Sequence, residues 1–222
     1  LSGSLDVSAL QAAVADVVAR HEPLRTTMTE HEGVCTQVVH EDAAPIFTIG
    51  DVASGDLDTT LADIAHETFD LTNDFPVRFT LFRIDQSDVE FALAMVVHHV
   101  AGDGWSLGPL VRDVAVAYAA RVGGGVPGWP VLPVQYADYA LWQREVLGSE
   151  DDAGSVIAGQ LSYWVRQLEG MPEELVLPVD RPRPAVASYA GARVSVDVPA
   201  GVWAGVDELA RSRGCSSFMV LH

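Results

Sequence analysis

The chain has 222 residues, of which 49% are hydrophobic and 20% are charged, so it can fill the core of one sizeable domain or two small ones and is not a disordered chain. Thirteen basic residues face 31 acidic ones, which gives a formal net charge of -18. This charge argues against nucleic acids and anionic membrane surfaces as partners, because both need basic patches.

The chain opens with a predicted amphipathic helix within residues 5–25. Asp6 is its expected N-cap and Pro23 marks its end. Its apolar face comprises Leu10, Val14, Val17 and Val18. Two strands, residues 24–28 and 34–40, are predicted to follow around the turn "EHEG".

A second amphipathic helix and a pair of strands come next. The apolar face of this helix comprises Leu61, Ile64, Ala65 and Phe69. Residues 77–84 and 89–97 predict two paired strands, joined by Asp85 to Asp88. The second strand is nearly all apolar, which predicts that it is covered on both faces.

The rest of the chain predicts mainly helices. One begins at Ser106 as N-cap and has Leu110, Val114 and Tyr118 on one side. Residues 123–133 are rich in glycine and proline and predict a loop. Further elements are expected as helices at 136–147, 157–170, about 201–213 and from 216 onward, an extended segment at 177–184, and a strand at 193–198. Helices and strands that alternate indicate an α/β or α+β class.

Cysteine usage and the apolar runs bear on the compartment. Cys35 and Cys215 match no metal or redox spacing, which predicts free thiols and favours a reducing cytoplasm. The longest strongly apolar run, Phe91 to Val97, is too short to cross a bilayer. The chain starts on Leu1 and stops within "FMVLH", so we expect it to be a piece of a longer polypeptide.

Chemistry-bearing residues gather where the second strand of the pair ends, in "MVVHHVAGDGWS". Because strand side chains alternate, His98 and His99 are expected to point opposite ways, one into a cleft and one into a supporting network. A histidine exchanges a proton near neutral pH. Asp103 is expected to orient a ring nitrogen or to pair with an arginine, and the flanking Gly102 and Gly104 let a substrate approach closely.

From the residues alone, three interpretations of this stretch stay open. It is a catalytic site, or a structural histidine pair beside a plain glycine turn, or a metal site of two histidines and one aspartate. Adjacent strand histidines point apart and cannot easily share one ion, which disfavours the metal site.

Four segments carry a resemblance to a known family. "HHVAGDG" fits HHxxxDG, and "RHEPLRTTM" at residues 20–28 fits RHExLRTxF except for Met28. "YADYALW" at 136–142 fits YxDYAxW, and "LPVDRPRP" at 177–184 is close to LPxDRPRP. Over essentially its whole length the chain resembles the condensation domains of non-ribosomal peptide synthetases, within the chloramphenicol acetyltransferase-like superfamily.

The resemblance implies an α/β (α+β) sandwich, a chloramphenicol acetyltransferase-like lobe with a mixed sheet flanked by helices. Residues 1–175 would be the amino-terminal lobe with its connecting helices, lacking its first strand and helix region, and residues 176–222 the linker and the beginning of the carboxy-terminal lobe. The family's first motif and its later motifs would lie outside the chain. We therefore expect the isolated piece to associate with itself and to lack activity.

The resemblance also implies an acyltransferase that forms peptide bonds in secondary-metabolite biosynthesis. Its substrates would arrive on the phosphopantetheine arms of upstream and downstream carrier proteins, beside an adenylation domain of the same cytoplasmic synthetase, with no metal and no bound cofactor. In this family His99 is assigned to catalysis, His98 and Asp103 to structural support, and Gly104 lies close to the reacting centre.

The remaining motif residues are interpreted as structural. Arg20, His21, Glu22 and Arg25 are expected to form an ion-pair cluster, and Tyr136, Tyr139 and Trp142 to pack in the core or between elements. Arg181 and Arg183 are expected to tie the extended linker to a lobe. Trp105, Ser106 and Asp138 complete the structural motif candidates.

Two alternatives of other kinds stay open. One is a stand-alone acyltransferase that uses coenzyme A or a lipid acceptor on the same fold; the segments 20–28 and 177–184 count against it. The other is a non-catalytic docking or recruitment domain; the intact HHxxxDG stretch counts against that one.

Overall fold

The computed structural model describes residues 1–41, 44–174, 176–188, 191–192 and 194–222. The chain divides into two compact units, Leu1–Glu169 and Gly170–His222. Within the described ranges, none of the helices has the length and apolar character needed to cross a membrane.

The first unit is built on a mixed three-stranded sheet of β3 (Ile46–Val52), β4 (Val77–Ile84) and β5 (Phe91–Val97), in the order β3-β4-β5. β4 and β5 pair antiparallel, as predicted. β3 pairs parallel to β4, and it was missed because Gly50 and Asp51 resemble a turn. This strand is defined by a partner about thirty residues away.

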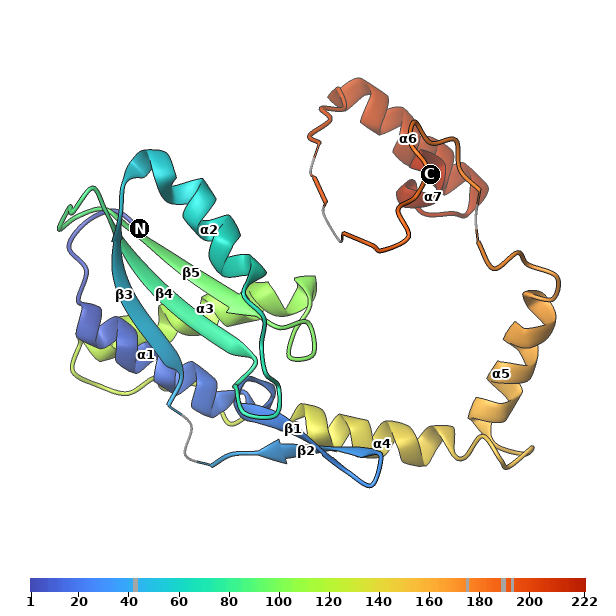
Figure 1. Ribbon diagram of the computed structural model, residues 1–222, viewed down its shortest axis with the longest axis horizontal. Helices are drawn as coiled ribbons and strands as arrows, with labels where there is room; N and C mark the ends of the chain where they lie inside the picture. The colour runs from blue at the N-terminus through green and yellow to red at the C-terminus, as the bar shows by residue number, and fades with distance from the viewer. Residues whose placement is uncertain (42–43, 175, 189–190, 193) are drawn as a thin grey trace. The chain divides into compact units, whose positions relative to one another are not determined.

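Helices cover both faces of this sheet (Figure 1). α1 (Val7–Arg20) and α3 (Gly104–Val122) pack against each other and on one face, and α2 (Leu57–His66) lies on the other. The predicted apolar face of α1 is buried, and Asp6 accepts the amide of Ala9 as its N-cap. The core side chains with no exposed surface include Val14, Val17, Val18, Val77, Phe79 and Leu81. Burial of each is worth about 1.5–3 kcal/mol.

Two expectations about β5 and α2 are wrong. β5 is not covered on both faces: six of its seven residues are only half-buried, while β4 is the more buried strand because it lies between two partners. Phe69 does not belong to α2, which ends at His66; it lies in the segment before β4 instead. Of the predicted apolar face, Leu61 and Ile64 are half-buried and Ala65 is exposed.

A hairpin follows α1. The helix ends at Arg20, and Pro23 lies in a short 3-10 turn, η1 (Glu22–Arg25). β1 (Thr26–His31) and β2 (Val34–Val39) then pair antiparallel, as predicted. The turn is shorter than "EHEG", because only Glu32 and Gly33, both with positive φ, lie outside the strands. A second short 3-10 turn, η2 (Ser54–Asp56), precedes α2.

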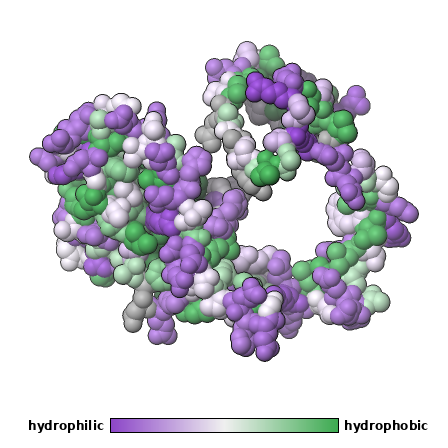
Figure 2. Space-filling model, viewed as in Figure 1, coloured by the Kyte–Doolittle hydropathy of each residue, from purple (hydrophilic) through white to green (hydrophobic). Residues whose placement is uncertain are grey.

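Two helices end the first unit, α4 (Tyr136–Leu147) and α5 (Val156–Gln167), after the predicted loop. The aromatic residues of α4 were expected to pack in the core or between elements, and none of them lies in the core. Tyr136 and Trp142 are 56% and 57% exposed, and Tyr139 lies between them with its ring centroid 5.8 Å from each. Figure 2 shows hydrophilic and hydrophobic surface side by side over this part of the chain.

The second unit holds α6 (Ala200–Arg213) and α7 (Ser217–Leu221), which confirms the two helices predicted near the end. Residues 194–198 form no strand, so that prediction is wrong for them, and Arg193 lies outside the described residues. Residues 177–184 form neither helix nor strand and bend at Asp180 and Arg181. Arg183 pairs with Glu174 at 2.9 Å within this unit.

Candidate active site

The histidine pair lies in the first turn of chain after β5. The amide of His98 donates to the carbonyl of Pro76 at 2.9 Å, and its own carbonyl accepts the amide of Ala101 at 2.9 Å. The His98 ring folds back on this turn, where its Nδ1 accepts the amide of Val100 at 3.0 Å. The ring packs edge-on against Phe69. It is not among the side chains that line the cavity beside His99.

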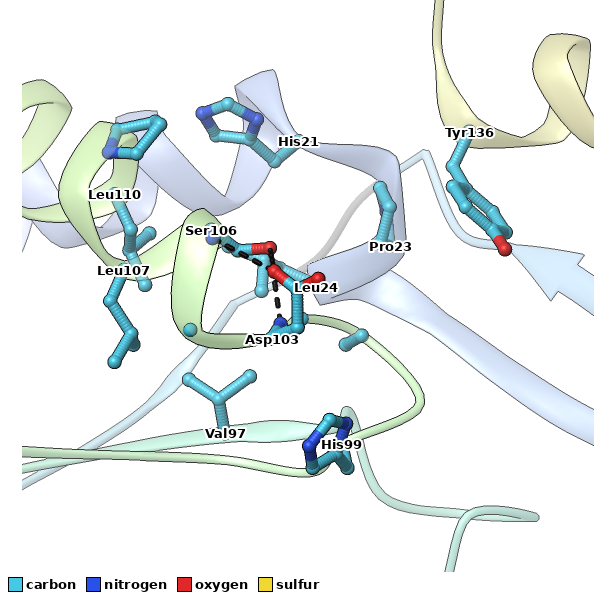
Figure 3. Close-up of a pocket in the computed structure, with 14 residues that line it drawn as sticks. His21, Pro23, Leu24, Val97, His99, Asp103, Ser106, Leu107, Leu110 and Tyr136 are labelled. Atoms are coloured by element: carbon cyan, nitrogen blue, oxygen red, sulfur yellow. Dashed lines mark hydrogen bonds between the residues drawn. The ribbon is translucent and has the colours of Figure 1, made fainter. Parts of the chain in front are cut away.

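His99 is exposed and lines a cavity of about 520 Å³. Figure 3 shows His99 on the loop after β5, Asp103 and Ser106 at the start of α3, and His21 and Pro23 on the segment after α1. The two histidines face different surroundings, as expected, but strand alternation is not the reason, because β5 ends at Val97 and both lie in the turn that follows. The site residues that sequence reasoning selected and that line this cavity are His99, Asp103, Gly104, Ser106 and Tyr136.

Asp103 is the N-cap of α3, a position predicted for Ser106. Its Oδ1 accepts the amides of Trp105 and Ser106, each at 3.0 Å, and the Ser106 hydroxyl at 2.8 Å. In return, the hydroxyl of Ser106, the third residue of the helix, accepts the amide of Asp103 at 3.1 Å. Asp103 takes the cap position because a carboxylate caps a helix at least as well as a hydroxyl does, and two amides of the first turn lie within its reach.

The charge of Asp103 is stabilised by this cap. The Ser106 hydroxyl and amide, the Trp105 amide and the nearby His99 together lower the pKa of Asp103 below its ordinary value. The hydrogen bonds found for its carboxylate run to the start of α3 and not to an arginine or a histidine ring. Asp103 therefore fixes the helix behind the loop. Trp105, its neighbour, is 90% exposed and does not line the cavity.

The two glycines of the motif meet different surroundings. A Cβ at Gly102 would lie 3.3 Å from the Cβ of Ser106, so this position is crowded by the helix start. A Cβ at Gly104 would meet no heavy atom within 4 Å, and Gly104 lines the cavity. The space beside Gly104 is therefore open to a substrate.

The cluster around Arg20 is an ion-pair network, as expected, but its centre was missed. Asp113 of α3 accepts Arg20 Nε at 3.1 Å and lies 2.9 Å from His21 Nε2 through the same oxygen. A separate pair joins Arg25 to Glu22 at 3.7 Å. The signal for Asp113 was present in the sequence: it is an acidic residue inside the apolar stripe of α3, where a charge needs a partner.

Arg20 also holds the loop that leads to α4. Its Nη1 donates to the carbonyl of Pro130 at 2.7 Å, and its guanidinium lies 4.8 Å from the ring centroid of Trp129. Gln135 then bridges the end of α1 and η1: its Nε2 donates to the Arg20 carbonyl at 2.9 Å, and its Oε1 accepts the Glu22 amide at 3.2 Å. These contacts bring Tyr136 to the cavity.

The other motif residues serve locally. Asp138 accepts the amide of Gln135 at 2.9 Å at the start of α4. Arg25 donates to the carbonyl of His40 at the end of the hairpin. Arg181 belongs to the second unit and is exposed. Cys35 and Cys215 are free thiols, as predicted. Within the part of the chain that the structure describes, no three His, Cys, Asp or Glu side chains gather closely enough to hold a metal ion.

The comparison with known proteins shows the family of the chain that forms this cavity. A family model described as "Condensation domain" matches residues 1–222. The chain belongs to the condensation domain family. It is 50% identical over its full length to a probable non-canonical nonribosomal peptide synthetase, CymA, of Salinispora arenicola, and covers 3% of that protein. It is 44% identical to a dimodular nonribosomal peptide synthase of Bacillus subtilis and covers 9% of it.

Solved structures confirm the fold of this condensation domain chain. The X-domain from teicoplanin biosynthesis superposes with a TM-score of 0.88 at 39% identity, over 97% of this chain and 47% of that one. The starter condensation domain of rhizomide synthetase RzmA superposes with a TM-score of 0.62 over 78% of this chain and 41% of that one. At 16% identity the second likeness shows the fold alone. The expected chloramphenicol acetyltransferase-like fold with a mixed sheet is thus confirmed.

Proposed function

We propose that this chain carries the histidine side of a site that forms amide bonds between two carrier-borne substrates. An upstream carrier protein presents an acyl or peptidyl thioester on phosphopantetheine, and a downstream carrier presents an aminoacyl amine. The observation that carries the proposal is the position of His99, from an intact HHxxxDG stretch, in the wall of the cavity. Membership of the condensation domain family supports it.

The reaction needs only a weak acid–base group from the protein. The amine attacks the thioester carbonyl, a C–N bond forms, the C–S bond breaks, and the proton lost by the amine ends on the released thiol. An α-amino group titrates near 8, so His99 needs only to accept this proton or to orient the amine. A thioester is already activated, and much of the rate comes from holding both arms in one place.

The first turn of α3 limits where an oxyanion finds donors. Asp103 already takes the amides of Trp105 and Ser106. The amide of Gly104, beside the open part of the cavity, is therefore the proposed donor from this turn. In this scheme Asp103 contributes by holding the helix start, and His98 by holding the turn.

The test uses the intact parent synthetase and two carrier proteins loaded with their substrates. His99→Ala is expected to slow product formation by about 100-fold or more, a typical effect of a general acid–base group. The matched control is His66→Ala, because His66 is an exposed histidine at the end of α2 whose ring lies 2.7 Å from the carbonyl of Ala62 and does not line the cavity. Equal product from the two variants would disprove the role of His99. His98→Ala is expected to reduce the yield of folded protein instead.

Partners and location follow from the same proposal. The domain would work with the carrier proteins and the adenylation domain of one synthetase, in the cytoplasm, with phosphopantetheine present as part of the substrates. A second candidate is a recruitment domain, because the X-domain from teicoplanin biosynthesis is described in a complex with OxyB. Binding of a tailoring enzyme without any turnover of loaded carriers would favour this candidate.

A further inference from the structure

The segment between α2 and β4 holds the histidine turn from outside the cavity. The ring of Phe69 meets the ring of His98 edge-on, with centroids 5.8 Å apart and planes at 86°. Seven residues later, the carbonyl of Pro76 accepts the His98 amide at 2.9 Å. Neither Phe69 nor Pro76 lines the cavity. The segment therefore contacts His98 through both its ring and its backbone.

Arg78 fixes Phe69 in this position. Its guanidinium carbon lies 4.0 Å from the Phe69 ring centroid, a distance at which a cation is attracted to an aromatic face. Its Nη2 donates to the Thr68 carbonyl at 2.7 Å and to Asp74 at 3.0 Å. Glu67 adds a longer contact of 3.5 Å. The arginine extends from the central strand and is only 19% exposed, so it ties the segment to the strand that has a partner on each side.

The ring of His98 controls the backbone beside His99. Its Nδ1 accepts the Val100 amide, so in the neutral ring the proton is on Nε2. This hydrogen bond spans His99, and a rotation of the His98 ring would break it. The orientation of His99 towards the cavity thus depends on the His98 ring, and that ring rests on Phe69.

We propose that Phe69, held in place by Arg78, is a positioning residue that fixes the His98 ring and thereby directs His99 into the cavity. The proposal rests on the function proposed above. Phe69 acts only through His98 and touches none of the reacting atoms.

The chain offers a matched control in the same segment. Phe75 also packs edge-on against a histidine, but its partner is His40 and not His98; the centroids are 5.3 Å apart and the planes at 67°. Phe69 and Phe75 are both half-buried. Phe69→Leu and Phe75→Leu therefore remove the same ring from similar surroundings, and only the first loosens His98.

The experiment measures product formation by the intact parent synthetase from carriers loaded with their substrates. Phe69→Leu is expected to lower kcat by about tenfold with KM unchanged, within the range that a small misplacement of a reacting group costs. Phe75→Leu and the conservative Phe69→Tyr are expected to stay within about twofold of the unchanged protein, since the first spares His98 and the second keeps the ring. Thermal midpoints of the two leucine variants should agree.

A second measurement does not depend on turnover. In the ¹⁵N spectrum of labelled histidines, His98 of the unchanged protein should show an unprotonated Nδ1 held as an acceptor. Phe69→Leu should produce a mixture of tautomers, and Phe75→Leu should not. Equal effects of the two leucine variants on kcat, or an unaltered His98 tautomer in Phe69→Leu, would overturn the proposal. Retained turnover in His99→Ala would instead overturn the proposed function and leave the tautomer test standing.

Discussion

Replacement of Asp113 by alanine tests whether the ion-pair network at the end of α1 stabilises the first unit. Asp113 is 10% exposed and accepts from both Arg20 and His21 through one oxygen. Its loss leaves an arginine that is 11% exposed without its carboxylate. A hydrogen bond to a charged group is worth about 1.5–3 kcal/mol, and breaking a fully buried ion pair costs about 3–5 kcal/mol. Because His21 is partly exposed, we expect about 2–4 kcal/mol.

Hydrogen exchange of the slowest amides in β4 measures this loss, because these amides open only when the sheet unfolds. A loss of about 3 kcal/mol corresponds to a rise in their exchange rate of about 150-fold. The control is Asp51→Ala, which removes an exposed aspartate–arginine pair: Asp51 accepts from Arg83 through both oxygens, at 2.8 and 3.0 Å, and is 47% exposed. Exposed pairs contribute about 0–1 kcal/mol. Equal effects of the two variants would refute the reasoning that burial gives the Asp113 network its weight.

Four further outcomes are expected. Since the folded-state pKa of Asp103 is lowered, its cap is present above the ordinary value near 3.9 and is lost as the pH falls through the lower folded value. The protection of the amides in the first turn of α3, measured relative to the exchange rate of an unfolded chain at the same pH, should therefore fall at low pH, and Asp103→Asn should remove this dependence. Phe79→Ala, at a site with no exposed surface, should cost about 3–5 kcal/mol in urea denaturation; a cost below about 1 kcal/mol would contradict the assigned core. Trp105→Ala should change the unfolding free energy by less than about 0.5 kcal/mol, because the ring is exposed. Purified residues 1–222 should associate through exposed apolar side chains such as Leu141 and Trp142, and sedimentation as a monomer, with turnover of loaded carriers, would contradict this.

Local patterns in the sequence determined most of the elements of the first unit. The spacing of the apolar residues and the Asp6 N-cap predict the two ends of α1 to within a few residues. The two apolar runs separated by a short polar turn define β4 and β5. The order of the four motifs led to the condensation domain family, because a motif is read from neighbouring residues. Such signals are short-range, so one sequence carries them in full.

Only the tertiary structure decided which residues meet. β3 is completed by its parallel pairing with β4: residues 46–49 favour a strand, but Gly50 and Asp51 interrupt that local pattern. Asp113 became the centre of the Arg20 network because α1 and α3 pack side by side. Phe69 was predicted on the apolar face of α2, but it lies after the end of that helix and contacts the ring of His98.

The sequence likewise did not show which helix faces are buried. The aromatic spacing of α4 is that of a buried face, yet Tyr136 and Trp142 are more than half exposed. The helix period shows which residues share a side but not what covers that side. The sequence by itself therefore predicted most elements of the first unit, the family, and His99 as the candidate catalytic residue. Packing between residues far apart in the chain decided the Asp113 network and the support behind the histidines.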